Sequence, residues 1–200
     1  MKKVLLVAVL VTAGIASQAQ AKFGIKAAAN FSKFGGDDKD FGQGLDPKFR
    51  IGVTGGFFAN IGINSNFSFQ PELLYSMDGA KYEESGEKAT LKTNFVNVPL
   101  LLQFNSTGGF FAETGPQIGF LTSAKIDDGT NDLDVKDSFK GTNFAWVLGA
   151  GYKLPGGFGF GARYNFGISN IIDEDGAEIR TRGFNVGLFY TFGGGTAAKK

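Results

Sequence analysis

The chain contains no cysteine and no histidine. Without them it has no disulfide bonds, no thiolate nucleophile, and neither the sulfur nor the imidazole ligands of ordinary zinc sites. It also lacks the side chain that most often acts as a general acid or base near neutral pH. Few catalytic options remain, and we predict a protein that is not an enzyme, with no catalytic residue, no metal and no cofactor.

Long apolar runs are scarce as well. The one such run, residues 4–16, follows Lys2 and Lys3 and precedes the small residues Ala19 and Ala21. This order is typical of a secretory signal with its cleavage site. Because the run is shorter than the roughly 20 residues of a membrane-spanning helix, we predict that residues 1–21 are a removed signal peptide and not an anchor.

Neither sign of charge is in excess. The sequence has 20 basic and 19 acidic residues, and loss of Lys2 and Lys3 would leave 18 against 19. A nearly neutral exported chain of single-domain length argues against nucleic acid as a partner. A membrane role would require a β-barrel, because only helices and closed barrels satisfy all backbone polar groups in lipid.

What the sequence does contain is strict alternation. Between residues 157 and 168 every even position is apolar, while the odd positions hold glycine, Arg163 or Asn165. Alternation with period two is typical of a β-strand. In a soluble sheet the second face would carry many Lys, Glu and Thr residues. A second face made mostly of glycines instead predicts a strand in the wall of a membrane barrel, with lipid on one side and a narrow polar interior on the other.

Seven further segments alternate over lengths near the roughly 9 to 11 residues of a tilted membrane strand. Short turns and longer polar loops follow one another between them, as in outer-membrane barrels with both termini on the periplasmic side. We therefore predict an all-β fold: an eight-stranded antiparallel up-and-down transmembrane β-barrel over residues 22–192, with a flexible tail at 193–200. The predicted strands are 23–31, 50–59, 67–76, 96–104, 110–120, 144–152, 157–168 and 184–192; the turns are 61–66, 105–109 and 153–157; the loops are 32–48, 77–90, 122–140 and 169–182.

The volume of the aromatic side chains shows whether the apolar face points into the barrel or out of it. The apolar faces carry most of the chain's 22 phenylalanines, and the interior of an eight-stranded barrel is too narrow for them. This disfavours a soluble periplasmic barrel with its apolar face inside. Three prolines at strand positions, Pro71, Pro99 and Pro116, each remove a ladder donor, so we expect β-bulges there.

Four charged residues fall on the inner face near the middle of their strands: Lys26, Glu72, Glu113 and Arg163. We predict that they form a buried, charge-balanced network, because an unpaired ion inside a narrow barrel costs several kcal/mol. Gly157, Gly159 and Gly161 would leave the room in which Arg163 reaches a carboxylate. The alternative is that Glu72 and Glu113 form a general-acid pair acting on a glycan or lipid, although paired cations would hold both ionised.

Acidic clusters occur in the predicted outer loops. Oxygen ligands of this kind can bind calcium, but their spacing does not match an EF-hand loop. We interpret them as solvated loop residues. The clusters are residues 37–38, 127–128 with 132 and 134, and 173–175.

Several short segments together resemble the outer-membrane β-barrel domain family that includes PorT-like and small porin-like proteins of Gram-negative envelopes. They are residues 24–27 with 30–31, 70–76, 98–102 and 115–116. The last strand also resembles an assembly signal for barrel insertion, through Asn185, Gly187, Tyr190 and Phe192. The resemblance implies an outer-membrane location and, for PorT-like relatives, a link to protein secretion or cell-surface organisation; it supplies no catalytic residue.

The predicted function is thus that of a non-enzymatic outer-membrane barrel with a narrow, charge-paired lumen. It would serve envelope structure, surface interaction or a secretion apparatus. An outer-membrane lipid- or peptide-modifying enzyme and a small-solute porin are the alternatives. The predicted partners are outer-membrane lipid, the barrel-assembly machinery, and a secretion or surface partner at the outer loops, with the barrel itself a monomer.

Overall fold

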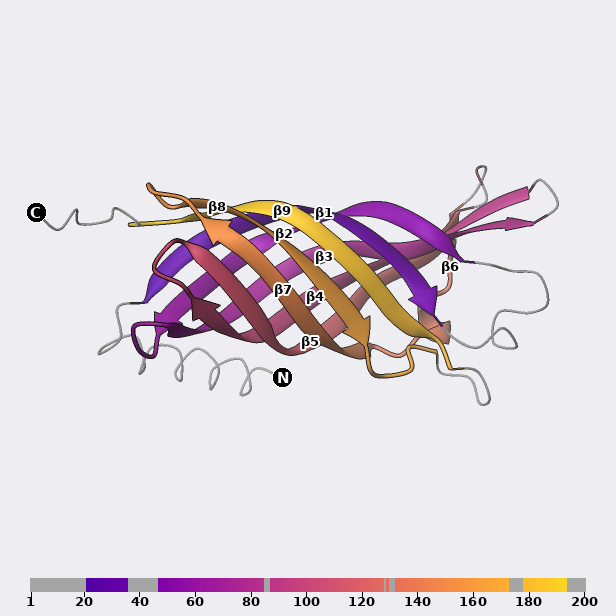
Figure 1. Cartoon of the computed structure of the whole chain (residues 1–200). Coiled ribbons are helices and arrows are strands. Elements are labelled where there is room, and N and C mark those ends of the chain that lie inside the picture. Colours follow the sequence, from indigo (N-terminus) through magenta and orange to yellow (C-terminus); the bar gives the residue numbers. More distant parts are fainter. Residues whose placement is uncertain are drawn as a thin grey trace, which may run out of the picture.

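The computed structural model describes residues 21–35, 47–84, 87–127, 129, 132–172 and 178–193. These residues form one antiparallel sheet curled into a barrel (Figure 1). The predicted signal peptide, apart from Ala21, and the tail beyond Gly193 lie outside the described residues. The strands are β1 Lys22–Gly35, β2 Lys48–Gly62, β3 Phe67–Glu84, β4 Glu87–Asn105, β5 Phe110–Asp127, β6 Asp132–Asp134, β7 Thr142–Lys153, β8 Phe158–Gly167 and β9 Arg180–Thr191.

Eight of these strands close the barrel. Neighbours along the chain pair with one another, β5 pairs with β7, and β9 returns to pair with β1. The three-residue strand β6 only adds to the end of β5, outside this ring. The predicted eight-stranded antiparallel barrel is confirmed. Among the described residues, no helix has the length and hydropathy needed to cross a membrane.

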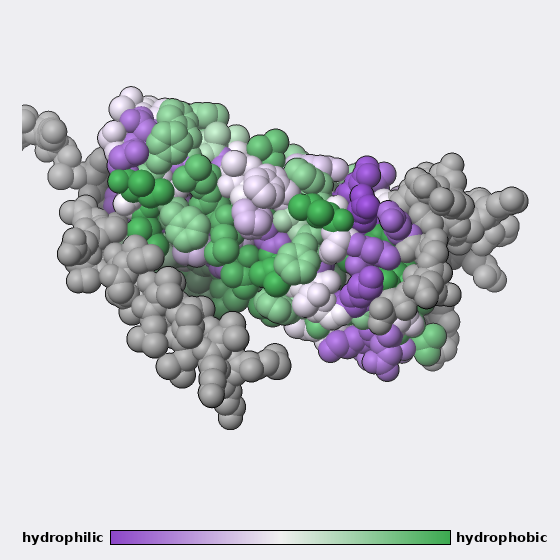
Figure 2. Space-filling model, turned by 90° about the horizontal axis from the view of Figure 1, so that it is seen from below, coloured by the Kyte–Doolittle hydropathy of each residue, from purple (hydrophilic) through white to green (hydrophobic). Residues whose placement is uncertain are grey.

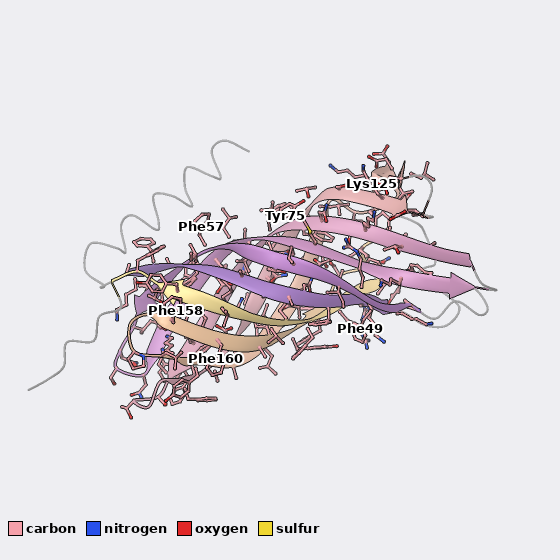
Figure 3. The ribbon with its side chains drawn as sticks, turned by 90° about the horizontal axis from the view of Figure 1, so that it is seen from above. Phe49, Phe57, Tyr75, Lys125, Phe158 and Phe160 are labelled. Atoms are coloured by element: carbon pink, nitrogen blue, oxygen red, sulfur yellow. The ribbon has the colours of Figure 1, made fainter. Side chains whose placement is uncertain are left out.

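The outer face of the wall is apolar. Phe57 and Leu188 are each 66% exposed and Ile51 is 65% exposed, and Figure 3 shows Phe57, Phe158 and Phe160 directed away from the barrel. Hydrophobic residues cover the middle of the face shown in Figure 2, and hydrophilic residues gather toward one end. Exposure on this scale is stable only against lipid, as the alternation predicted.

The two ends of the barrel differ in their connections. The end at which β1 begins and β9 ends has the short turns 63–66, 106–109 and 154–157, whereas β1 ends and β2 begins at the opposite end (Figure 1). We call these the turn end and the loop end. At Gly157 φ is +95°, a conformation that favours glycine and closes the last of these turns.

The predicted loop 77–90 is wrong. β3 and β4 continue through it as a paired hairpin to Glu84 and Glu87, beyond the last pairs with β2 and β5 at Lys81 and Thr90. The prediction ended the strands where apolar alternation ends, but strand pairing continues in water with polar side chains. Similarly, the predicted loop 122–140 includes the end of β5, strand β6 and a 3₁₀ turn at Lys136–Ser138.

The bulges expected at the prolines are absent. The register is the same on both sides of Pro71, Pro99 and Pro116. Each proline is paired with one neighbouring strand, and pairing with the other neighbour lapses for two residues that include the proline. The missing donor is therefore accommodated by a gap in the ladder without an inserted residue. Register shifts occur elsewhere, between Phe49 and Thr54 in β2 and between Asn94 and Phe95 in β4.

Apolar clusters close the loop end of the lumen, beyond a layer of buried polar side chains that includes Asn30, Asn97 and Asn143. Inward residues of the wall pack with residues of the outer connections in two clusters, and Phe139 contacts both. Backbone hydrogen bonds from Lys140 to Ile171 (2.8 Å) and from Ile171 to Ile179 (2.9 Å) fix these connections across the barrel mouth. The buried members are Phe34, Ala80, Ile171 and Ile179 in one cluster and Phe95, Leu121 and Ala124 in the other.

Candidate functional site in the barrel lumen

The four charged residues predicted for the lumen come from four different strands. Lys26 lies on β1, Glu72 on β3, Glu113 on β5 and Arg163 on β8. Each occupies an inward position because the alternation of its strand places the neighbouring residues on the lipid face. The structure brings all four together in the middle of the lumen.

Arg163 is the centre of this group. Its Nη1 and Nη2 donate to Glu72 Oε2 (2.6 Å) and Oε1 (2.7 Å), and its Nε donates to Glu113 Oε1 (2.5 Å). Lys26 Nζ donates to Glu72 Oε1 at 2.9 Å. The side chains of Glu72 and Glu113 are 0% and 2% exposed. A planar guanidinium suits this fork geometry, and a lysine could not reproduce it.

Neutral amides complete the hydrogen bonding of both carboxylates. Gln70 Nε2 donates to Glu72 Oε1 at 2.7 Å, and Gln103 Nε2 donates to Glu113 Oε2 at 3.1 Å. Asn60 in turn donates to both glutamines, at 2.9 and 3.0 Å. Buried charges are tolerated when their remaining lone pairs are satisfied in this way. We call the four charged residues the ion network.

The ion network has two positive and two negative side chains, so it is neutral overall. Both carboxylates accept several charge-assisted hydrogen bonds, which favour the ionised form. Neither is therefore positioned to release a proton to a substrate. The arrangement suits a structural crosslink between strands far apart in the barrel better than acid–base chemistry.

Three phenylalanines also point into the lumen, which the sequence reasoning did not foresee. Phe58, Phe111 and Phe189 each lie over a glycine directly opposite on a neighbouring strand. Their rings pack edge to face around Phe189, with centroids 6.0 Å from Phe58 and 5.7 Å from Phe111. The signal was present in the sequence, since each follows an outward apolar residue and interrupts the alternation: Phe57-Phe58, Phe110-Phe111 and Leu188-Phe189.

The glycines opposite these rings are Gly24, Gly151 and Gly159. A Cβ atom at Gly159 would lie 2.1 Å from the Phe189 ring, and Cβ atoms at Gly24 and Gly151 would come within 2.2 and 2.5 Å of Phe58 and Phe111. The glycines of the predicted strand 157–168 thus do not make room for Arg163. That room is at Gly149, where a Cβ would lie 2.9 Å from Arg163 Cγ and 3.0 Å from Glu113 Oε1.

Cavities of very different size lie in the described part of the lumen. A chamber of about 740 Å³, bordered by the three short turns, lies at the turn end. Phe111, Phe189 and Lys26 separate it from a cavity of about 30 Å³ beside Arg163. A cavity of about 20 Å³ lies nearer the loop end. The small cavities are of the size of single water molecules.

The residues of the predicted assembly signal lie on both faces of β9. Asn185 and Gly187 face the lumen, whereas Tyr190 and Phe192 lie at the turn end. The Tyr190 ring contacts Phe158 and Phe192, with centroid distances of 4.8 and 5.6 Å. Aromatic girdles are typical of the ends of outer-membrane barrels.

At the loop end, Asp127 and Asp132 pair with lysines, whereas Asp134 Oδ1 accepts from the backbone N–H of Lys136 at 2.9 Å. Lys92 Nζ lies 2.6 Å from Asp127 Oδ2 and 3.4 Å from Asp132 Oδ1. The hydrogen bond from Lys92 lowers the pKa of the half-buried Asp127. These contacts suit the interpretation as solvated loop residues. The acidic residues at 37–38, 128 and 173–175 lie outside the described residues.

A closed eight-stranded wall with an apolar outer face and a charged interior defines the chain as an outer-membrane β-barrel protein. A family model described as "Outer membrane protein beta-barrel domain" matches residues 16–173. The chain belongs to this family, and it is located in the outer membrane. A comparison with curated proteins gives no significant match.

Several solved structures are similar to this chain. Neisserial surface protein A matches with a TM-score of 0.56 and 16% identity, over 86% of this chain and 99% of that one. Ail, the attachment invasion locus protein of Yersinia pestis, matches with a TM-score of 0.46 and 16% identity over the same shares. OprG of Pseudomonas aeruginosa matches with a TM-score of 0.40 and 14% identity, over 86% and 94%. The first of these shows the shared barrel fold.

Proposed function

We propose that this protein is a non-enzymatic, non-conducting outer-membrane barrel that acts through its outer surface. The observation that carries the proposal is the ion network, because Arg163 ties β8 to β3 and β5 across the middle of the lumen. Beyond it, the apolar clusters fill the loop end. Open aqueous channels are a property of larger barrels, of about 16 to 18 strands.

Planar-bilayer recording tests the closed lumen. Purified protein is expected to give no stable conductance steps at neutral pH. Large, stable steps from the wild-type protein would contradict the proposal and favour the small-solute porin.

The projecting β3–β4 hairpin supports a role in surface interaction. It extends past the ends of β2 and β5 (Figure 1), so its outer edges lie clear of the wall. A photo-crosslinking residue in place of Lys81 on intact cells should yield a protein adduct that disappears when residues 83–88 are deleted. The same residue in place of the lipid-facing Leu188 is the control. Equal adducts at both positions would contradict a role of the hairpin.

The family resemblance noted in the sequence makes a PorT-like link to secretion the finer form of this proposal. Partner identification from the Lys81 adduct tests it directly. A component of a secretion apparatus supports the link, and an adduct with host or envelope material alone contradicts it.

We also propose that the barrel is a monomer and that Tyr190 and Phe192 serve as an insertion signal. Substitution Phe192→Ala should slow insertion by the purified barrel-assembly machinery, whereas Phe184→Ala, an outward aromatic of the same strand, should not.

The enzyme alternative is disfavoured because both Glu72 and Glu113 are bound to Arg163. Activity in lipid deacylation or peptide cleavage assays that is lost in Glu113→Gln would revive it.

A further inference from the structure

The chamber at the turn end carries an unbalanced charge. Its lining includes Lys22, Lys26 and Lys153, and no aspartate or glutamate among the described residues borders it. The remaining polar lining is neutral, made of asparagine, glutamine, serine and threonine side chains. An enclosed surface of this kind favours a negative charge inside the chamber.

Lys153 is the best placed of the three lysines. Its Nζ donates to Gln103 Oε1 and Asn105 Oδ1, both at 2.6 Å. Neither acceptor carries a charge, and in the described part of the chain no carboxylate lies within ion-pair distance of this ammonium. An ammonium group has three donors, so one remains beyond these two bonds. Lys153 is partly buried, it is attracted by Glu113, and it is repelled by Lys22 and Lys26. A bound anion would offset that repulsion.

The ion network does not compensate this charge. Lys26 is paired with Glu72, and both carboxylates are bound to Arg163. Since that group is neutral in itself, it leaves Lys22 and Lys153 without a carboxylate in contact among the described residues. They lie on the open side of the network, toward the turns.

The base of the chamber is apolar. Phe58, Phe111 and Phe189 line it, with the ammonium of Lys26 5.8 Å from the Phe58 ring centre and that of Lys153 5.4 Å from the Phe111 ring centre. A ligand that reaches these cations therefore also reaches three aromatic rings. Burial of an apolar group against such rings is favourable by roughly 25 cal/mol per Å².

We propose that the chamber binds a small amphipathic oxyanion, a carboxylate or phosphate on a compact apolar body. The ammonium groups of Lys153 and Lys22 take the oxyanion, and the three phenylalanines take the apolar body. The volume of about 740 Å³ lies within the roughly 300 to 1,000 Å³ of small-molecule pockets. Entry is from the side of the short turns, independent of the outer surface.

Calorimetric titration of the protein in zwitterionic detergent tests this site. The probes are phenyl phosphate, benzoate, inorganic phosphate and benzyl alcohol. We expect phenyl phosphate or benzoate to bind with an affinity that falls as salt is added, and the tighter of the two identifies the headgroup. Inorganic phosphate should bind more weakly, and neutral benzyl alcohol should not bind. Equal binding of inorganic and phenyl phosphate would refute the apolar part of the site.

Lysine variants locate the binding. Lys153→Gln should weaken binding of the tighter probe about tenfold, which is ~1.4 kcal/mol, and the exposed Lys22→Gln should weaken it less. Lys92→Gln removes the same charge at the loop end and should leave the affinity unchanged. No binding of either aromatic anion at millimolar concentration, or an equal loss in Lys92→Gln, would overturn the proposal. Lys22→Gln and the wild type should have the same unfolding midpoint, so that a difference in their affinities reflects binding and not folding.

Discussion

The two halves of the lumen are closed to different degrees although the same strands form the wall around both. Toward the loop end, inward residues pack against the outer connections in apolar clusters around Phe139. Toward the turn end, three lysines and neutral polar groups surround an open chamber. The ion network separates the two halves. Closure of a small barrel is therefore a property of particular layers of side chains, not of the strand number alone.

Substitutions in the ion network, which separates the two halves, should have the largest effect on stability. Arg163→Ala leaves two buried carboxylates with only Lys26, so we expect it to lower the free energy of unfolding by about 3 to 5 kcal/mol. Urea unfolding in lipid vesicles measures the effect. The exposed pair of Arg180 and Glu178 offers a matched control: Arg180→Ala should cost about 1 kcal/mol or less. Equal losses in the two variants would show that the network does not stabilise the barrel.

Packing at the loop end should come next. Phe34 is 1% exposed, and Phe34→Ala creates a cavity that should cost about 3 kcal/mol. Leu133 on β6 is 63% exposed, and Leu133→Ala should change stability by less than about 0.5 kcal/mol. Both are measured by the same unfolding assay. A similar effect of the two substitutions would mean that the apolar clusters do not hold the outer connections in place.

The aromatic base of the chamber should respond more moderately. In Gly159→Ala the new methyl group meets the Phe189 ring, and overpacking of this kind costs about 1 to 3 kcal/mol. A double-mutant cycle measures how strongly the two positions depend on each other, because Phe189→Ala removes the ring that the new methyl group meets. We expect the double variant to lose less stability than the sum of the two single variants. Simple additivity would show that the glycine and the ring do not depend on each other.

The smallest effect is expected at the exposed charges of the loop end. Lys92 lowers the pKa of Asp127, so the contact contributes above the unfolded pKa of about 3.9 and is lost as the pH falls through the lower folded pKa. Lys92→Gln should raise the pKa of Asp127, which carboxyl NMR can measure. The unfolding midpoint at neutral pH should not change resolvably. Lys136→Gln is the control and should leave the Asp127 titration unchanged. An equal shift of the Asp127 pKa in both variants would mean that the loss of any nearby positive charge, and not the contact with Lys92, causes the effect.

The sequence was sufficient for the wall and for the charged positions of the lumen, because both depend on local alternation. Residues 157–168 identify an outward face and an inward Arg163 without any knowledge of the neighbouring strands. The inward rings were missed because Phe58 and Phe189 are accommodated by glycines on other strands, a relation that only the register reveals. The hairpin was missed because its polar residues carry no membrane signal, and β-pairing in water does not need one.

The prolines give the wall an uneven resistance to force. The three gaps in pairing, between β2 and β3, β3 and β4, and β4 and β5, continue one another across adjacent strands along residues 70–73, 98–101 and 115–116. A load applied along this line meets fewer interstrand hydrogen bonds than one applied between β7, β8 and β9. If the cylinder is torn mechanically, the tear should run through strands β2 to β5 and not between β7, β8 and β9.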